Sequence, residues 1–202
     1  MAMAARYIPY FLLMALSFML SFAQANDNYD YALAAFQQAR YPEGVEFLKK
    51  AALQGNDKAQ NDLGILYHKG MYVPRDYKEA LKWYRKSAKQ GYPFAMLNIG
   101  LLYYKGHGVQ QNYVKARSWF LKAARKGDPD AQFNLGVMYQ NGNGMKQDIY
   151  KAYVWYAISA INGSKKGLDA RDLVAMDFDK QKIAQGDGEA QKFYERYPPQ
   201  SY

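Results

Sequence analysis

The sequence predicts an all-α protein in which helix hairpins stack into a solenoid. Two observations predict it. Glycines recur at intervals of 36 residues at Gly55, Gly91, Gly127 and Gly163, and all three tryptophans of the chain fall at one position of that period. Because one helix hairpin cannot bury both of its faces, such units stack against their neighbours. The 202 residues suffice for one solenoid of this kind.

The first 25 residues are typical of a secretory signal peptide. Arg6 precedes an apolar run over 11–23, and Ala23-Gln24-Ala25 provides the small residues that a signal peptidase recognises. The run has 13 residues, fewer than the ~20 that a membrane-spanning helix needs. We expect cleavage after Ala25 and a periplasmic or secreted mature chain. An uncleaved N-terminal anchor is the alternative.

The remaining residues divide into two caps and a repeated middle. Residues 26–54 are expected to form an N-terminal capping pair, with helices over 31–41 and 42–55. Residues 55–163 hold three 36-residue repeats: 55–90, 91–126 and 127–162. Residues 164–202 contain divergent helices, expected over 168–176 and 179–197, and a tail expected to lack structure. Gly186 and Gly188 are expected to weaken the last helix.

The first helix of each repeat has apolar and small residues on one face. In the first repeat these are Ala59, Leu63, Gly64 and Tyr67, at i, i+4, i+5 and i+8. A glycine in the left-handed conformation is expected to end each of these helices; these glycines are Gly70, Gly106 and Gly142. Two residues later Gly108 and Gly144 recur, but the first repeat has Tyr72. We therefore expect a different backbone in that loop.

The second helix of each repeat follows a polar N-cap residue: Asp76, Asn112 or Asp148. Its predicted buried stripe includes Trp83 and Tyr84, then Trp119 and Phe120 in the next repeat. We expect the tryptophans to be core residues whose truncation destabilises the fold.

The pattern G-x3-A-x3-L-G-x2-Y-x2-G-x-G-V-x2-D-x3-A-x2-W-Y resembles the Sel-one-like repeat, a relative of the tetratricopeptide repeat. The resemblance covers 55–163, and 31–197 with the caps. It implies a right-handed, tetratricopeptide-like superhelix that binds other proteins, often in bacterial envelopes. Some periplasmic relatives are immunity proteins against phospholipase effectors. Cysteine-rich relatives bind β-lactams, but this chain has no cysteine.

The composition argues against most catalytic chemistry. There is no thiol, only two histidines occur, and no S-x-x-K, G-x-S-x-G, H-E-x-x-H or phosphate-loop motif is present. We expect no enzyme activity, no metal and no cofactor. The net charge of +9 favours solubility or weak attraction to acidic surfaces. Nucleic acid is not expected, because no recognition motif occurs.

The free face of the first helices is the candidate binding site. In tetratricopeptide-like folds, the equivalent positions line the concave surface. The twelve candidate residues are Lys58, Asn61, Ile65, His68, Phe94, Leu97, Leu101, Tyr104, Asp130, Phe133, Val137 and Gln140. Several are apolar or aromatic, which is typical of a groove that holds a helix or an extended peptide. Partial burial of Ile65, Leu101 and Val137 by neighbouring repeats is also expected.

These features favour a monomeric, non-catalytic scaffold that binds another protein in its concave groove. An immunity protein that neutralises a phospholipase-type effector is the close alternative. An enzyme, or a binder of cell-wall fragments or β-lactams, is the alternative from a different class.

Overall fold

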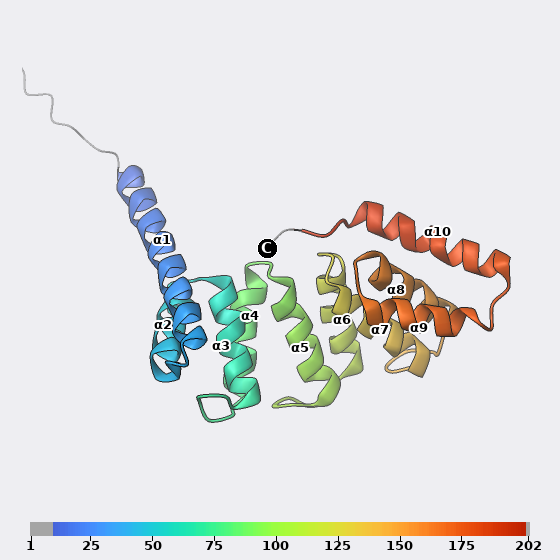
Figure 1. The fold of residues 1–202 in the computed structure, drawn as a ribbon, viewed down its shortest axis with the longest axis horizontal. Helices are drawn as coiled ribbons and strands as arrows, with labels where there is room; N and C mark the ends of the chain where they lie inside the picture. The colour runs from blue at the N-terminus through green and yellow to red at the C-terminus, as the bar shows by residue number, and fades with distance from the viewer. Residues whose placement is uncertain (1–9, 201–202) are drawn as a thin grey trace, which may run out of the picture. The chain divides into compact units, whose positions relative to one another are not determined.

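The structure, a computed structural model, describes residues 10–200, with side chains from residue 19 onward except at position 22. Secondary structure within these residues is entirely helical (Figure 1). The predicted all-α stack of helix hairpins is confirmed, while its right-handed turn stays a prediction. The first nine residues of the predicted signal peptide and the last two of the tail lie outside the described residues.

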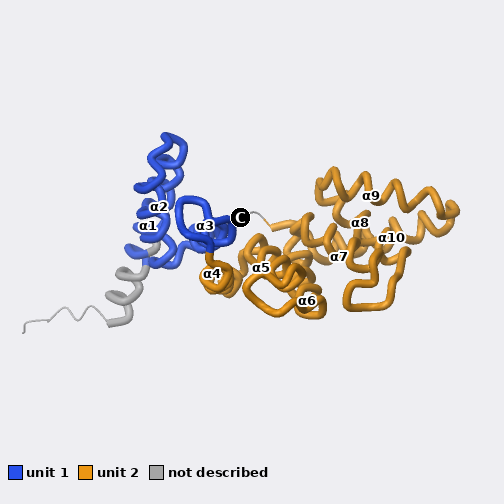
Figure 2. Tube along the Cα trace, turned by 90° about the horizontal axis from the view of Figure 1, so that it is seen from below, with its two compact units in different colours: residues 1–75 blue, residues 76–202 orange. Residues whose placement is uncertain are grey.

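The chain forms two compact units, residues 1–75 and 76–202 (Figure 2). Unit 1 contains α1 (Tyr10–Gln37), α2 (Tyr41–Leu53) and α3 (Asp57–Lys69). Unit 2 contains α4 (Tyr77–Lys89), α5 (Pro93–Lys105), α6 (Tyr113–Ala124), α7 (Pro129–Asn141), α8 (Ile149–Ile161), α9 (Lys165–Ala175) and α10 (Lys180–Arg196). Within each unit consecutive helices pack together, except that α10 returns to α8.

Helix α1 is much longer than the helix expected over 31–41. It continues without a break through the predicted cleavage site and ends at Gln37. No glycine or proline occurs between residues 10 and 37, so nothing in the local sequence stops the helix. None of the helices within the described residues combines the length and hydropathy that a membrane-spanning segment needs.

The helix ends follow the predicted local chemistry. Gly70, Gly106 and Gly142 adopt φ values of 70°, 72° and 69°, and each backbone N–H donates back into its helix. The side chains of Asp76, Asn112 and Asp148 accept hydrogen bonds from backbone N–H groups in the first turns of α4, α6 and α8. These bonds satisfy groups that a helix leaves unpaired at its termini.

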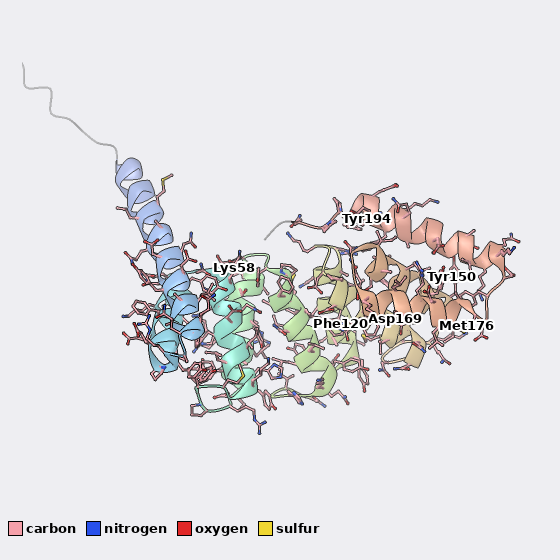
Figure 3. The ribbon with its side chains drawn as sticks, in the orientation of Figure 1. Lys58, Phe120, Tyr150, Asp169, Met176 and Tyr194 are labelled. Atoms are coloured by element: carbon pink, nitrogen blue, oxygen red, sulfur yellow. The ribbon has the colours of Figure 1, made fainter. Side chains whose placement is uncertain are left out.

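Close packing between the two helices of a repeat depends on a glycine facing an aromatic ring. A Cβ atom placed on Gly100 of α5 would lie 2.5 Å from the ring of Phe120 on α6. Gly136 of α7 faces Tyr156 of α8 in the same way. Phe120, labelled in Figure 3, is completely buried. The ring therefore fills the volume that a larger residue on the first helix would occupy.

The prediction that the tryptophans form the core is only partly correct. Trp83 is 8% exposed, but Trp119 and Trp155 are half-buried. The next residue carries the buried ring instead, as Tyr84 and Phe120 show at 0% exposure. In each second helix the tryptophan thus immediately precedes a more deeply buried aromatic ring.

Two lysines of the second helices lie over these tryptophan rings. Lys86 Nζ lies 3.9 Å from the centre of the Trp83 ring, and Lys122 Nζ lies 4.2 Å from that of Trp119. On α8 the ring of Phe193 from α10 covers Trp155 instead, with 5.0 Å between ring centres. The lysine ammonium groups therefore make cation–π contacts with the rings of Trp83 and Trp119.

The C-terminal helix is built around one of its glycines. A Cβ on Gly186 would lie 2.6 Å from the ring of Tyr153, whose hydroxyl donates to Asp187 Oδ1 at 2.7 Å. Gly186 is therefore needed for packing, whereas a Cβ on Gly188 would meet nothing within 4 Å. The tail has no helix at its described end, yet Pro199 lies against Gly127.

Candidate functional site

The central part of the predicted groove lies on α5. Phe94, Leu97, Leu101 and Tyr104 share one face of this helix because of their spacing. Phe94 is 45% exposed, and Leu101 and Tyr104 are half-buried. Leu97 is buried at 7% exposure, so it contributes to packing and not to an open surface.

Tyr104 is held in a fixed orientation by neighbouring groups. Its hydroxyl accepts a hydrogen bond of 2.5 Å from Asn143 Nδ2, in the loop after α7. Its ring meets the Tyr113 ring edge-on, with 5.2 Å between centres. An aromatic side chain that is already ordered loses little entropy when a partner covers it.

The predicted positions on α7 are largely engaged within unit 2. Asp130 forms an ion pair of 2.7 Å with Lys166 of α9, and the same ammonium lies 5.0 Å from the centre of the Phe133 ring. Gln140 Oε1 accepts a hydrogen bond from the Tyr156 hydroxyl. Val137 is half-buried, as are the other three. The end of this face is therefore covered in part by the chain's own capping helix.

In unit 1 the predicted positions lie on α3. Lys58 (Figure 3), Ile65 and His68 are half-buried, while Asn61 is buried at 3% exposure. Asn61 Nδ2 donates to Asp62 Oδ1 at 3.2 Å. The expected partial burial of Ile65, Leu101 and Val137 is confirmed.

Unit 1 also contains an apolar pocket that the sequence reasoning missed. The pocket has a volume of about 410 Å³ and lies between α1, α2, α3 and the loop after α3. Leu33, Phe36 and Ile65 contribute apolar wall, and Met71 and Tyr72 from the loop close one side. Two sequence signals could have pointed to it: Asp62, where the other repeats have asparagine, and Tyr72, where they have glycine.

The expectation of a different backbone around Tyr72 is wrong. Tyr72 has φ of 60°, beside 68° for Gly108 and 72° for Gly144. The tyrosine thus adopts a left-handed conformation that ordinarily favours glycine. Its ring stacks on Tyr41 with 4.3 Å between centres and an angle of 14°, which favours this placement.

One carboxylate lies among these apolar walls. Asp62 lines the pocket, and its Oδ2 accepts a 2.7 Å hydrogen bond from the Tyr29 hydroxyl. Burial raises the pKa of Asp62, although the hydrogen bonds from Tyr29 and Asn61 and the charge of Lys58 act in the opposite direction. Such a group can orient a ligand or offset its positive charge.

The remaining candidates for chemistry are a metal cluster and the histidine of the second repeat's loop. Within residues 10–200 no three histidine, aspartate or glutamate side chains come close enough together to hold a metal ion. His107 stacks on Tyr77, with 4.8 Å between ring centres, in the loop that follows α5. Its place in the repeat's own turn agrees with a structural role.

Helix pairs of similar length that repeat over α3–α8, with a glycine ending the first helix of each pair, define a helix-repeat solenoid protein. The Sel1 repeat model matches residues 40–56, 57–92, 93–128 and 129–164. The chain therefore belongs to the Sel1 repeat family. The match adds a partial unit at 40–56 to the three full repeats.

Two solved structures have a similar fold. A Sel1 repeat protein from Oxalobacter formigenes is 28% identical, with 85% of this chain and 72% of that one covered and a TM-score of 0.69. The protective antigen c5321 of uropathogenic Escherichia coli, which displays an SLR fold, is 24% identical, with 86% and 46% covered and a TM-score of 0.54. None of the curated proteins compared with the chain matches it.

Proposed function

We propose that this chain is a non-catalytic protein-binding scaffold. Membership of the Sel1 repeat family supports the proposal. The main structural support is the aromatic and apolar face of α5. On this face Phe94 is 45% exposed, and Leu101 and Tyr104 are half-buried. Aromatic anchors of this kind supply much of the binding energy in protein interfaces.

We also propose that the protein acts after export, with residues 1–25 removed. The signal-peptide pattern of residues 1–25 supports this. Asn26 Oδ1 accepts a hydrogen bond of 2.9 Å from Asn56 Nδ2, and Asn28 Nδ2 donates to Gln54 Oε1 at 2.7 Å. A chain beginning at Asn26 would keep both of these hydrogen bonds. Mass spectrometry of the exported protein should find that N-terminus, and a mature chain retaining Arg6 would contradict it.

The scaffold proposal is tested by comparing baits in an envelope extract. Wild-type chain, Phe94→Ala and Tyr104→Ala are used, with Val114→Ala as control because Val114 is 59% exposed on α6 and is not one of the candidate groove residues. A genuine partner should bind wild type and the control equally, and the two variants about 1–3 kcal/mol more weakly. Thermal melts must show that the variants remain folded. Equal binding by all four baits would exclude the α5 face.

The captured partner also decides between an adaptor and an immunity protein. An immunity role requires a toxic effector, such as a phospholipase, whose activity falls when the purified chain is added. An adaptor leaves its partner's activity intact.

A further inference from the structure

Unit 1 departs from the repeat at two positions that come together in one pocket. Asp62 occupies the place of Asn98 and Asn134, so that one repeat alone has a carboxylate there. Tyr72 occupies the place of Gly108 and Gly144. Both side chains line the same 410 Å³ pocket, a volume within the range of known ligand sites.

Tyr72 is held in an unfavourable backbone conformation. A non-glycine residue at φ of 60° is strained, because its Cβ crowds the backbone in the left-handed region. In unit 2 the same place has no room for a side chain, because a Cβ on Gly144 would lie 2.5 Å from Cβ of Tyr113. In unit 1 the Tyr72 ring instead lies on Tyr41 and reaches Phe36, at 5.8 Å between centres. The strained residue therefore builds an aromatic wall that the other repeats lack.

Asp62 has unused capacity to accept hydrogen bonds. Tyr29 and Asn61 each donate one bond to it, while an ionised carboxylate can accept about four. In the described part of the chain, no lysine or arginine nitrogen lies within 4.0 Å of this carboxylate. A carboxylate partly removed from water is stabilised by an opposite charge placed beside it.

The charge distribution also favours a cationic ligand at unit 1. Without the expected signal peptide, unit 1 is residues 26–75, which contain six basic and six acidic residues and are neutral. Residues 76–202 contain 20 basic and 12 acidic residues, a net charge of +8. Long-range repulsion of a cation is therefore weaker at unit 1 than at unit 2.

We propose that the unit 1 pocket binds an arginine side chain from a segment of the partner protein. This rests on the proposed scaffold function. The guanidinium pairs with the Asp62 carboxylate, which it can do through two parallel hydrogen bonds. The apolar stem lies along Leu33 and Ile65, and the planar head or stem contacts the Tyr72 wall.

The proposal is tested with two peptides that differ only in charge. The purified chain is titrated by NMR with acetyl-Leu-Arg-Leu-amide and with the citrulline analogue, which keeps the shape of arginine but is neutral. We expect amide shifts at Ile65 and Met71, and at least about tenfold weaker binding of the citrulline peptide. Equal binding of both peptides, no binding, or shifts confined to unit 2 would overturn the proposal.

Two variants restore the residues that the other repeats use and are therefore expected to fold. Asp62→Asn should weaken arginine-peptide binding about tenfold and leave citrulline-peptide binding unchanged. Tyr72→Gly should weaken both peptides. Asp169→Asn, which removes an exposed carboxylate of α9 (Figure 3), should bind like wild type. An unchanged affinity in Asp62→Asn would contradict the proposed charge pairing.

Failure of this proposal can be distinguished from failure of the scaffold function. If a captured partner binds wild type and Asp62→Asn equally but loses affinity for Phe94→Ala, the scaffold stands and the arginine pocket is wrong. If no partner depends on Phe94 or Tyr104, the proposed scaffold face is wrong, whatever the peptides do.

Discussion

The loop after α3 in unit 1 and the loops after α5 and α7 in unit 2 share one backbone conformation but differ in one side chain. Tyr72, Gly108 and Gly144 all have φ between 60° and 72°. In unit 2 the neighbouring tyrosines leave no space for a Cβ at these glycines. In unit 1 the Tyr72 ring stacks on Tyr41. In unit 2, glycine is therefore required both by the lack of space and by the positive φ. In unit 1, the stacking contact with Tyr41 offsets the backbone strain at Tyr72.

The largest expected effect concerns the glycine-facing ring of unit 2. Phe120→Ala should lower the free energy of unfolding by about 3–5 kcal/mol, because the ring is completely buried against Gly100. Trp119→Ala should cost clearly less, since Trp119 is half-buried under Lys122. Chemical denaturation of both variants tests this. A larger loss of unfolding free energy for Trp119→Ala than for Phe120→Ala would mean that the tryptophan positions, and not the positions that follow them, form the core.

The second prediction concerns Asp128, the N-cap residue of α7 in unit 2. The corresponding N-cap residue in unit 1 is Asn56, which carries no ionisable group. Burial raises the pKa of Asp128 to about 6, and its Oδ2 is buried without a hydrogen-bond partner among the described residues. The folded state then holds a proton more tightly than the unfolded state, so stability falls as the pH rises from about 4 to 6. Titration of Asp128 should change the free energy of unfolding by at most roughly 3 kcal/mol.

Asp128→Asn should abolish this fall in stability with rising pH, because asparagine does not ionise. The variant should keep the N-cap hydrogen bond, because asparagine is as good an N-cap residue as aspartate. Urea denaturation from pH 4 to 8 measures the difference in stability between wild type and variant. Relative to the variant, wild type should become less stable across that window. A constant difference would show that Asp128 does not titrate abnormally.

The loop comparison itself yields the third prediction. Gly108→Ala should lower the free energy of unfolding by about 1–3 kcal/mol, because the new Cβ meets Tyr77 and φ is positive. Tyr72→Gly should change it by less than about 1 kcal/mol, since relief of strain offsets loss of the stack on Tyr41. Thermal melts of the two variants provide the measurement. Similar losses of stability in Gly108→Ala and Tyr72→Gly would contradict the proposed difference between the two loops.

The smallest expected effects come from the two glycines of α10. Gly186→Ala should destabilise by about 1–2 kcal/mol through contact with Tyr153. Gly188→Ala should stabilise by about 0.5–1 kcal/mol, because alanine has the higher helix propensity and meets no neighbour. Paired denaturation curves should show opposite signs. The same sign for both would contradict the packing role of Gly186.

Much of the candidate site could be located from the sequence because helical spacing places residues on faces. Phe94, Leu101 and Tyr104 lie together on α5, as their spacing predicts. The burial of Leu97 on the same face could not be predicted from spacing, because exposure depends on which residues the neighbouring helices cover. The unit 1 pocket was missed for a similar reason, since Asp62, Tyr41 and Tyr72 meet only when α2, α3 and the loop pack together.

The sequence by itself determined the 36-residue period, the helix pairs and their ends, because caps and glycine turns depend on bonds within a few residues. Only the tertiary structure decided which aromatic ring is buried against glycine, that α1 continues through Ala25, and that Tyr72 adopts the glycine conformation. Those features depend on atoms that are distant along the chain. The space and contacts those atoms provide decide whether a ring is buried or a strained backbone is retained.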